Sequence, residues 1–241
     1  MQLFQTALAA IYPPRCLGCG GMVEQDFGLC AACWTDTTFV GRTACDTCGT
    51  PLPGVPDGTA LTCDGCIAAP KPWDHGRAAL IYEGVGRKLV LQLKHADRQE
   101  IAAPAARWMH RVCKDILTPE TLIAPVPLHW TRLAKRRYNQ SALLARALAH
   151  VSGNDWCPDL LLRPKRTPSL DGKNRVERAA TLHGAITLNP RRRHRIVGRP
   201  VLIVDDVLTS GATLTVCAEA CRAAGAGRLC IAVLARVGKD A

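Results

Sequence analysis

The stretch from Val201 to Thr213, VLIVDDVLTSGAT, decides the fold. Its apolar residues run directly into the adjacent carboxylates of Asp205 and Asp206, and a turn of small and hydroxyl-bearing residues follows. A short run of Val, Ile and Leu is typical of a strand in a buried parallel sheet. The sequence after the turn has the apolar spacing of a helix. The stretch therefore predicts a strand, a loop and a helix, with two carboxylates where the strand ends.

The loop of this unit has the composition of a phosphate site. A strand–loop–helix unit places backbone N–H groups and the positive end of a helix dipole at the loop. Hydroxyl groups come from Thr209, Ser210 and Thr213, while Gly211 and Ala212 leave room for a ligand beside the backbone. The loop is not a Walker A loop, because no Gly-Lys-Thr follows. We expect it to bind a phosphate monoester.

The two carboxylates extend this prediction to a sugar. Ligands of α/β proteins bind at the carboxyl ends of the strands, where Asp205 and Asp206 are expected to lie. Carboxylate oxygens suit the vicinal hydroxyls of a sugar or a Mg²⁺ ion. A phosphate on one side and a diol on the other together describe a ribose 5-phosphate.

The chain after Asp74 alternates apolar strands with amphipathic segments, which predicts a parallel α/β sheet. The expected strands are 76–82, 121–128, 199–206 and 228–237, and the expected helices are 84–96, 105–117, 139–151 and 213–227.

Length, composition and charge limit the class of protein. With 241 residues, 48% of them hydrophobic, the chain suffices for one full-sized core and a small appendage. A formal net charge of +11 favours anionic partners such as phosphates, nucleic acid or an acidic membrane. No apolar run reaches the length of a membrane span. The first basic residue is Arg15, which makes a poor secretory signal, so we expect a cytoplasmic location.

Eight of the thirteen cysteines form four C-x-x-C pairs in a segment with little apolar periodicity. In a reducing compartment such pairs favour structural Zn²⁺. A disulfide framework, a redox motif, an iron–sulfur cluster and interleaved pairing are the alternatives. Sequential pairing predicts two sites, Cys16/Cys19/Cys30/Cys33 and Cys45/Cys48/Cys63/Cys66. The other five cysteines are expected to be core residues, although the spacing of Cys217 and Cys221 also allows a ligand pair.

These motifs together carry a resemblance to a known family. VLIVDDVLTSGAT resembles the phosphoribosyl pyrophosphate (PRPP) signature of type I phosphoribosyltransferases. The paired knuckles, followed by segments 81–94, 125–140, 161–170 and 183–186, resemble the ComF/GntX-like family. The resemblance implies a double zinc-ribbon domain in residues 1–72. It also implies a type I phosphoribosyltransferase-like domain in residues 73–241, a parallel sheet flanked by helices.

The resemblance also assigns roles to individual residues. Asp205 and Asp206 would hold the ribose hydroxyls, directly or through Mg²⁺, and the loop from Thr209 to Thr213 would bind the 5-phosphate. Asp205, Asp206 and Lys165 would be catalytic. The pyrophosphate loop would comprise Arg132, Arg136, Arg137, Asn139 and Gln140; the hood over the site would carry Arg163, Lys165 and Arg166; and Arg87 and Lys94 would face the site.

The chain departs from the family pattern mainly around the hood and the acceptor side. Arg137 stands where the family usually has glycine, and Leu170, Thr181 and Ile186 replace an expected Gln, Asn and Phe. The family resemblance implies a phosphoribosyltransferase of unknown acceptor. The alternative is a single-stranded-DNA-binding accessory protein of competence-type DNA uptake, whose PRPP site is regulatory or a relic. The basic runs 132–137 and 191–195 would then follow a phosphate backbone, whereas otherwise they are solvated loops.

Overall fold

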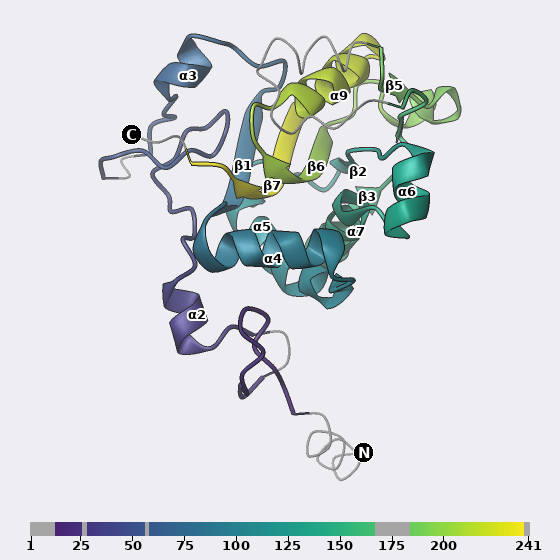
Figure 1. Ribbon diagram of the computed structural model, residues 1–241. Helices are drawn as coiled ribbons and strands as arrows, with labels where there is room; N and C mark the ends of the chain where they lie inside the picture. Colours follow the sequence, from purple (N-terminus) through teal and green to yellow (C-terminus); the bar gives the residue numbers. More distant parts are fainter. Residues whose placement is uncertain (1–12, 26–27, 56–57, 167–183, 239–241) are drawn as a thin grey trace.

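The computed structural model describes residues 13–25, 28–55, 58–166 and 184–238. The segment 167–183, which contains Leu170 and Thr181, lies outside the described residues, whereas the expected hood residues Arg163, Lys165 and Arg166 lie within them. Within them, five parallel strands form one sheet in the order β1-β7-β6-β2-β3 (Figure 1). The strands are β1 (His75–Ile81), β2 (Leu122–Pro125), β3 (Asp155–Trp156), β6 (Val201–Leu208) and β7 (Leu229–Arg236). The predicted parallel α/β sheet is confirmed.

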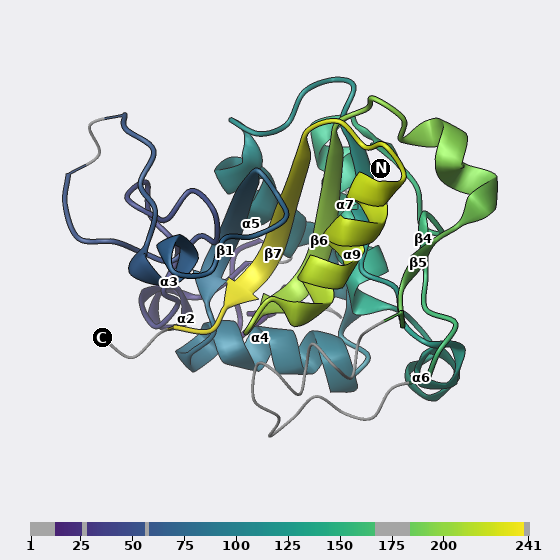
Figure 2. The same cartoon turned by 90° about the horizontal axis from the view of Figure 1, so that it is seen from above.

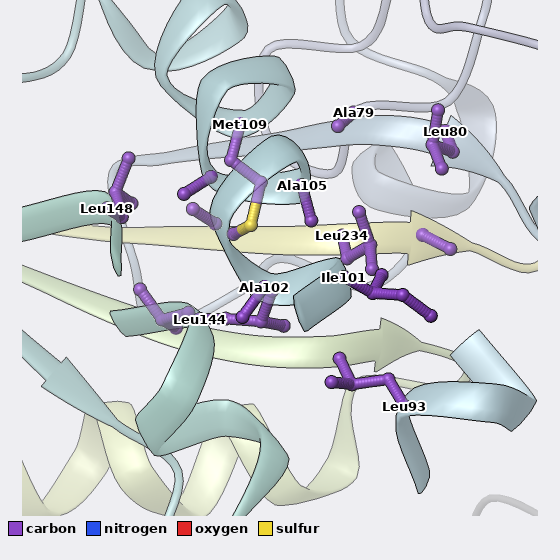
Figure 3. Packing of buried hydrophobic residues seen from close by; sticks show 14 of the residues in the cluster. Ala79, Leu80, Leu93, Ile101, Ala102, Ala105, Met109, Leu144, Leu148 and Leu234 are labelled. Carbon is purple, nitrogen blue, oxygen red and sulfur yellow. The ribbon is translucent and has the colours of Figure 1, made fainter. Parts of the chain in front are cut away.

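Helices cover both faces of the sheet. One face carries α4 (Gly84–His95), α5 (Ala102–Cys113) and α7 (Gln140–Ser152), and the other carries α9 (Ala212–Ala223) (Figures 1 and 2). Figure 3 shows the first of these layers, where Met109 and Ala105 of α5 and Leu144 and Leu148 of α7 lie among buried strand residues. The core is aliphatic because β6 and β7 supply mostly Val, Ile, Leu and Ala to both faces.

The remaining elements are short. They are α2 (Ala31–Thr35), α3 (Asp64–Ile67), η1 (Gln99–Ile101), α6 (Trp130–Arg136), the antiparallel pair β4 (Leu161–Leu162) and β5 (Thr187–Leu188), and η2 (Pro190–Arg195). Throughout the described ranges, each helix is too short or too polar to cross a membrane.

The chain order creates a switch point between β2 and β6. These strands are neighbours, but the connection from β2 passes through α7 to β3 on one side, while the connection from β6 passes through α9 to β7 on the other. In open α/β sheets, ligands bind in the crevice outside the carboxyl ends of two such strands. The segment after β2 and the loop after β6 border that crevice.

The strand β6 is shifted by two residues from the predicted 199–206: it begins at Val201 and ends at Leu208 rather than at Asp206. It stays paired with β7 as far as Leu208, opposite Arg236, whereas its register with β2 stops at Val204, opposite Pro125. The second proline of that segment, Pro127, has no N–H to continue the ladder. Asp205 and Asp206 therefore lie where β6 has lost one neighbour, and this leaves an open edge for a ligand.

Candidate functional site

The two carboxylates of β6 are each held by a different helix. The Nζ of Lys94, at the end of α4, lies 3.2 Å from Oδ1 of Asp206. Oδ1 of Asp205 accepts hydrogen bonds from Ser141 Oγ (2.7 Å), at the start of α7, and from the backbone N–H of Asp206 (2.9 Å). Asp206 is only 5% exposed, and its Oδ2 has no hydrogen-bond partner in the described part of the chain. A buried acceptor of this kind is unfavourable, so a hydroxyl or cation that reached it would be stabilised.

The surroundings of Asp205 change its acidity. Burial raises the pKa of Asp205 to about 7, and the neighbouring charge of Asp206 also raises it, while the bond from Ser141 lowers it. The carboxyl group therefore takes up or releases a proton near neutral pH. A ligand that needs the ionised form would release that proton when it binds.

The loop after β6 and Asp205 share one pocket. The pocket has a volume of about 320 Å³ and is lined by Tyr82, Lys94, Asp205 and residues 207–214. Gly211 has a φ of +80° and is the N-cap of α9, which it enters without a side-chain cap. Glycine adopts this left-handed conformation at little cost. The loop thus presents the N-terminus of a twelve-residue helix to the same space as Asp205 and Lys94, an arrangement suited to an anion.

The residues of the expected pyrophosphate loop differ in their surroundings: Asn139 and Gln140 are held at the start of α7, whereas the arginines lie on α6 or at its end. Asn139 is the N-cap of α7: its Oδ1 accepts from Ser141 N–H (3.0 Å), and its Nδ2 donates to the Val126 carbonyl (2.9 Å). Gln140 is buried at the first turn of the same helix. Asn139 therefore fixes the start of α7, from which Ser141 reaches Asp205. Arg132 and Arg136 lie half-buried on α6.

Arg137 explains one departure from the family pattern. It ends α6 with a φ of +67°, the left-handed conformation that favours glycine, and its side chain is 82% exposed, 3.8 Å from Asp97. A residue with a Cβ is strained there by roughly 1 kcal/mol. The glycine conformation is thus retained although the glycine is not.

The three expected hood residues differ in their exposure to solvent. Arg163 is buried, and its pKa is lowered by that burial and by the charge of Arg132, which places these two guanidinium groups near each other. Lys165 and Arg166 are exposed. Arg87 is also exposed, and the described residues that line the pocket include Lys94 but not Arg87.

Three residues beside the site were not anticipated from sequence: Ser141, Tyr82 and Trp73. Ser141 is 2% exposed and lies two residues after the cap residue Asn139, so an Asn at the start of the expected helix 139–151 with a hydroxyl two residues later was a usable signal. Tyr82, which directly follows β1, lines the pocket. The Trp73 ring approaches Gly211, since a Cβ built on that glycine would lie 3.4 Å from the ring. No local pattern marked the last two.

The eight clustered cysteines form two groups of four among the described residues, in the sequential pairing. The ligand atoms of each group lie within 4.8 Å of one another, with Cys19 Sγ 3.7 Å from Cys30 Sγ and Cys48 Sγ 3.6 Å from Cys63 Sγ. A tetrahedral Zn²⁺ with Zn–S bonds of about 2.3 Å requires sulfur separations of about 3.8 Å, so both groups fit the ion. The other five cysteines are buried in the core as expected.

Two family models match parts of the chain. Residues 7–67 match a family model described as a double zinc ribbon domain, and residues 165–241 match one described as a phosphoribosyl transferase domain. The chain is 31% identical over 199 residues to the DNA utilization protein YhgH of Salmonella typhi, which covers 80% of this chain and 83% of that protein. The chain belongs to the ComF/GntX-like family.

A second relative extends over more of the length. This ComF/GntX-like chain is 27% identical over 229 residues to Competence protein F of Haemophilus influenzae, covering 92% of this chain and 96% of that one. A solved allosteric regulatory enzyme of purine biosynthesis is 14% identical, with a TM-score of 0.40 over 60% of this chain and 30% of that one. A likeness that distant adds nothing to the family assignment.

The two basic runs of this ComF/GntX-like chain lie at different ends of the sheet. Helix α6, with Arg132 and Arg136, follows β2, whereas η2 (Pro190–Arg195) precedes β6. Within η2, Arg192 Nε is 2.9 Å from Asp159, and Arg195 is 2.9 Å from Asp155. Part of the second run is therefore engaged in internal ion pairs, which favours the solvated-loop interpretation for 191–195.

Proposed function

We propose that the crevice outside β2 and β6 binds PRPP or ribose 5-phosphate together with Mg²⁺, and that the chain transfers the phosphoribosyl group to an acceptor. The observation that carries the proposal is the shared pocket of Asp205, Lys94 and the loop 209–213. The proposal places the zinc ribbons in residues 1–72 and the ribose site in residues 73–241.

Each part of the ligand has a counterpart in this pocket. The 5-phosphate would accept hydrogen bonds from the loop hydroxyls and from backbone N–H groups at the start of α9. The ribose hydroxyls would donate to Asp205 and Asp206, with Ser141 and Lys94 holding those carboxylates in place. The exposed cations Lys165 and Arg166, with Arg132 and Arg136, would meet the pyrophosphate.

A divalent cation fits the same carboxylates. Oδ2 of Asp206 is a buried acceptor with no partner among the described residues, and carboxylate oxygens are the ligands that Mg²⁺ prefers. The ammonium group of Lys94 already neutralises Oδ1 of Asp206, so a cation at this carboxylate would compete with that ion pair. When bound, Mg²⁺ would supply neutralisation of the pyrophosphate charge.

The chemistry requires little more than positioning and charge. The bond between the anomeric carbon and the pyrophosphate oxygen breaks, and pyrophosphate leaves with the electron pair. The acceptor atom then bonds to the anomeric carbon and gives up its proton. Asp205 and Asp206 would place negative charge beside the positive, oxocarbenium-like sugar, which stabilises the transition state.

Calorimetry with Mg²⁺ and PRPP tests the binding step. Asp206→Asn keeps the shape but removes one charged acceptor, and it should weaken Mg²⁺-dependent binding by roughly 10- to 100-fold, the range for one charge-assisted hydrogen bond. Asp159→Asn is the matched control, because Asp159 is paired with Arg192 at η2. Wild-type protein that binds neither PRPP nor ribose 5-phosphate would overturn the proposal.

Isotope-labelled PRPP, incubated with the protein, Mg²⁺ and a library of nucleotide precursors, tests the transfer step. A labelled ribosylated product would establish the reaction and identify the acceptor. Binding without any labelled product would restrict the site to a regulatory or relic role.

The surface of α6 favours a second candidate function, binding of single-stranded DNA. Trp130 is 69% exposed there, and the same helix carries Arg132, Lys135 and Arg136. Exposed aromatic rings beside cations are typical of sites on which bases stack while phosphates are neutralised. Two relatives carry the names DNA utilization protein and competence protein, which also supports this candidate.

Salt titration distinguishes a DNA-binding site on α6 from general attraction between DNA and a positively charged protein. Trp130→Ala should weaken binding of a single strand, and charge reversal at Arg132 and Lys135 should flatten the dependence of affinity on salt. Trp34→Ala is the control, since Trp34 is 50% exposed on the first zinc ribbon. Equal losses in both tryptophan variants, or an unchanged salt dependence after charge reversal, would reject a DNA site on α6.

A further inference from the structure

One tryptophan connects the second zinc site to the candidate phosphate loop. Trp73 is 4% exposed, and its indole Nε1 donates to the carbonyl of Thr47 at 2.7 Å. Thr47 lies inside the Cys45–Cys48 knuckle. At the other end of the ring, Cη2 would lie 3.4 Å from a Cβ built on Gly211, so the ring faces the loop across the space that a Cβ would occupy.

A second contact supports the same connection. Arg236 is buried, and its Nη1 donates to the carbonyl of Cys48 at 3.2 Å. Arg236 is also the register partner of Leu208, the residue directly before the loop. Leu208 and Leu214, on either side of the loop, belong to the same buried cluster as Trp73 and the four cysteines of the second site. Both ends of the loop therefore rest on the packing around that site.

The first zinc site makes its contacts elsewhere. Its Gly18 lies against Val85, and the Asp36 carboxylate accepts a hydrogen bond from the Val85 N–H (3.1 Å) at the start of α4. Cys16 and Cys33 belong to the other core cluster, on the opposite face of the sheet from α9. Among the described residues, the contacts of the first site thus concern α4 and not the loop.

We infer that Trp73 is a positioning residue that holds the phosphate loop in its binding conformation, and that the loop depends on the second zinc site for this reason. A metal bound by Cys45, Cys48, Cys63 and Cys66 fixes the knuckle whose carbonyls anchor Trp73 and Arg236. The ring then limits the movement of Gly211, whose left-handed backbone must persist for the loop to face the pocket. The part that concerns ligand affinity rests on the proposed function.

Hydrogen exchange on the full chain tests the inference without any ligand. Trp73→Phe removes the N–H and shortens the ring, but keeps an aromatic core residue. We expect exchange of amides 209–214 to accelerate by about five- to tenfold, the change that one net hydrogen bond supports, with two zinc ions still bound. Trp108→Phe is the matched control, because Trp108 packs against Phe39 on the other face. Unchanged exchange at 209–214, or equal acceleration in both variants, would overturn the inference.

A ligand measurement distinguishes positioning from general destabilisation. Trp73→Phe should weaken ribose 5-phosphate binding several-fold while Mg²⁺ binding at the carboxylates stays as in wild type. A parallel loss of both affinities would indicate a merely structural role and overturn the inference. If wild type binds neither PRPP nor ribose 5-phosphate but the exchange difference is present, the proposed function fails and the positioning role of Trp73 stands.

Discussion

The two zinc sites share their ligand chemistry but differ in how deeply they enter the molecule. In the first site Cys19 is exposed and Cys30 partly buried, whereas all four cysteines of the second site are buried. Figure 1 shows α2, with the first site, beneath α4, and α3, with the second, beside β1. All four cysteines of the second site are thus part of the core, whereas only two of the first site are, and that site also contacts the start of α4.

The difference shows what the α/β domain provides to each cysteine segment. Neither cysteine segment has enough apolar sequence for a core of its own, so each packs against the core of the α/β domain. The second site also shares polar contacts: the Asp46 carboxylate meets His75 at 2.6 Å and Arg77 at 2.7 Å. A site with such shared contacts cannot be removed without disturbing the strands it touches.

Loss of one cysteine ligand should give the largest difference in stability between the two zinc sites. Cys63→Ser should release one zinc ion and unfold much of the α/β domain, because structural zinc contributes on the order of 10 kcal/mol, comparable to the whole stability of a domain. Cys30→Ser should also release one ion but leave the sheet folded. Elemental analysis should find about two zinc ions per wild-type chain and one per variant, and thermal melts by circular dichroism report the fold. Equal melts in both variants would abolish the contrast.

Substitution of one aspartate in each ribbon, both of which contact the α/β domain, should give a smaller difference in stability. Asp46→Ala breaks a partly buried contact with Arg77 and His75 and should destabilise the fold by about 2 kcal/mol, because Arg77 keeps its second partner, Asp115. Asp36→Ala removes the acceptor for the Val85 N–H in the first turn of α4 and should cost about 1 kcal/mol. Urea denaturation measures both. If Asp36→Ala is the more destabilising, the first ribbon is integrated more deeply than its contacts indicate.

A third prediction compares the candidate site with the ribbons through the pH dependence of stability, which should come from Asp205 and not from the ribbon residue Asp36. The pKa of Asp205 is about 7 in the folded chain, above the value of about 3.9 for an unfolded one. Between these values the folded state binds more protons, so its contribution to stability falls as the pH rises from about 4 to 7. Asp205→Asn should flatten this dependence, measured as urea midpoints across that pH range, whereas Asp36→Asn should leave it intact. The same slope in both variants would reject the raised pKa.

The smallest effect should come from Arg137, far from either zinc site in the chain. Arg137→Gly relieves a left-handed backbone and should stabilise the fold by about 1 kcal/mol. A higher urea midpoint, with zinc content unchanged, is the expected result. A lower midpoint would mean that the exposed guanidinium contributes more through Asp97 than the strain removes.

The sequence allowed the fold and the zinc sites to be predicted because both depend on local patterns. Apolar runs marked β6 and β7, and the spacing of C-x-x-C pairs marked the metal groups. The interactions between segments could not be predicted in this way. Ser141 meets Asp205 across 64 positions of the chain, and Trp73 approaches Gly211 across an even longer interval. Such contacts depend on the crossing of strands and helices, which no short window of sequence contains.

The place of β7 in the sheet has a consequence for the order of assembly during synthesis. Among the described strands β7 is made last, yet it lies between β1 and β6, and β1 has no other partner in the sheet. While the ribosome is still making α9, the second ribbon and β1 therefore have no sheet to join. The cysteines of that ribbon emerge long before β7 is made, so zinc can be captured, or lost to competing chelators, during this interval. Metal loading and the closure of the sheet are consequently separate events in time.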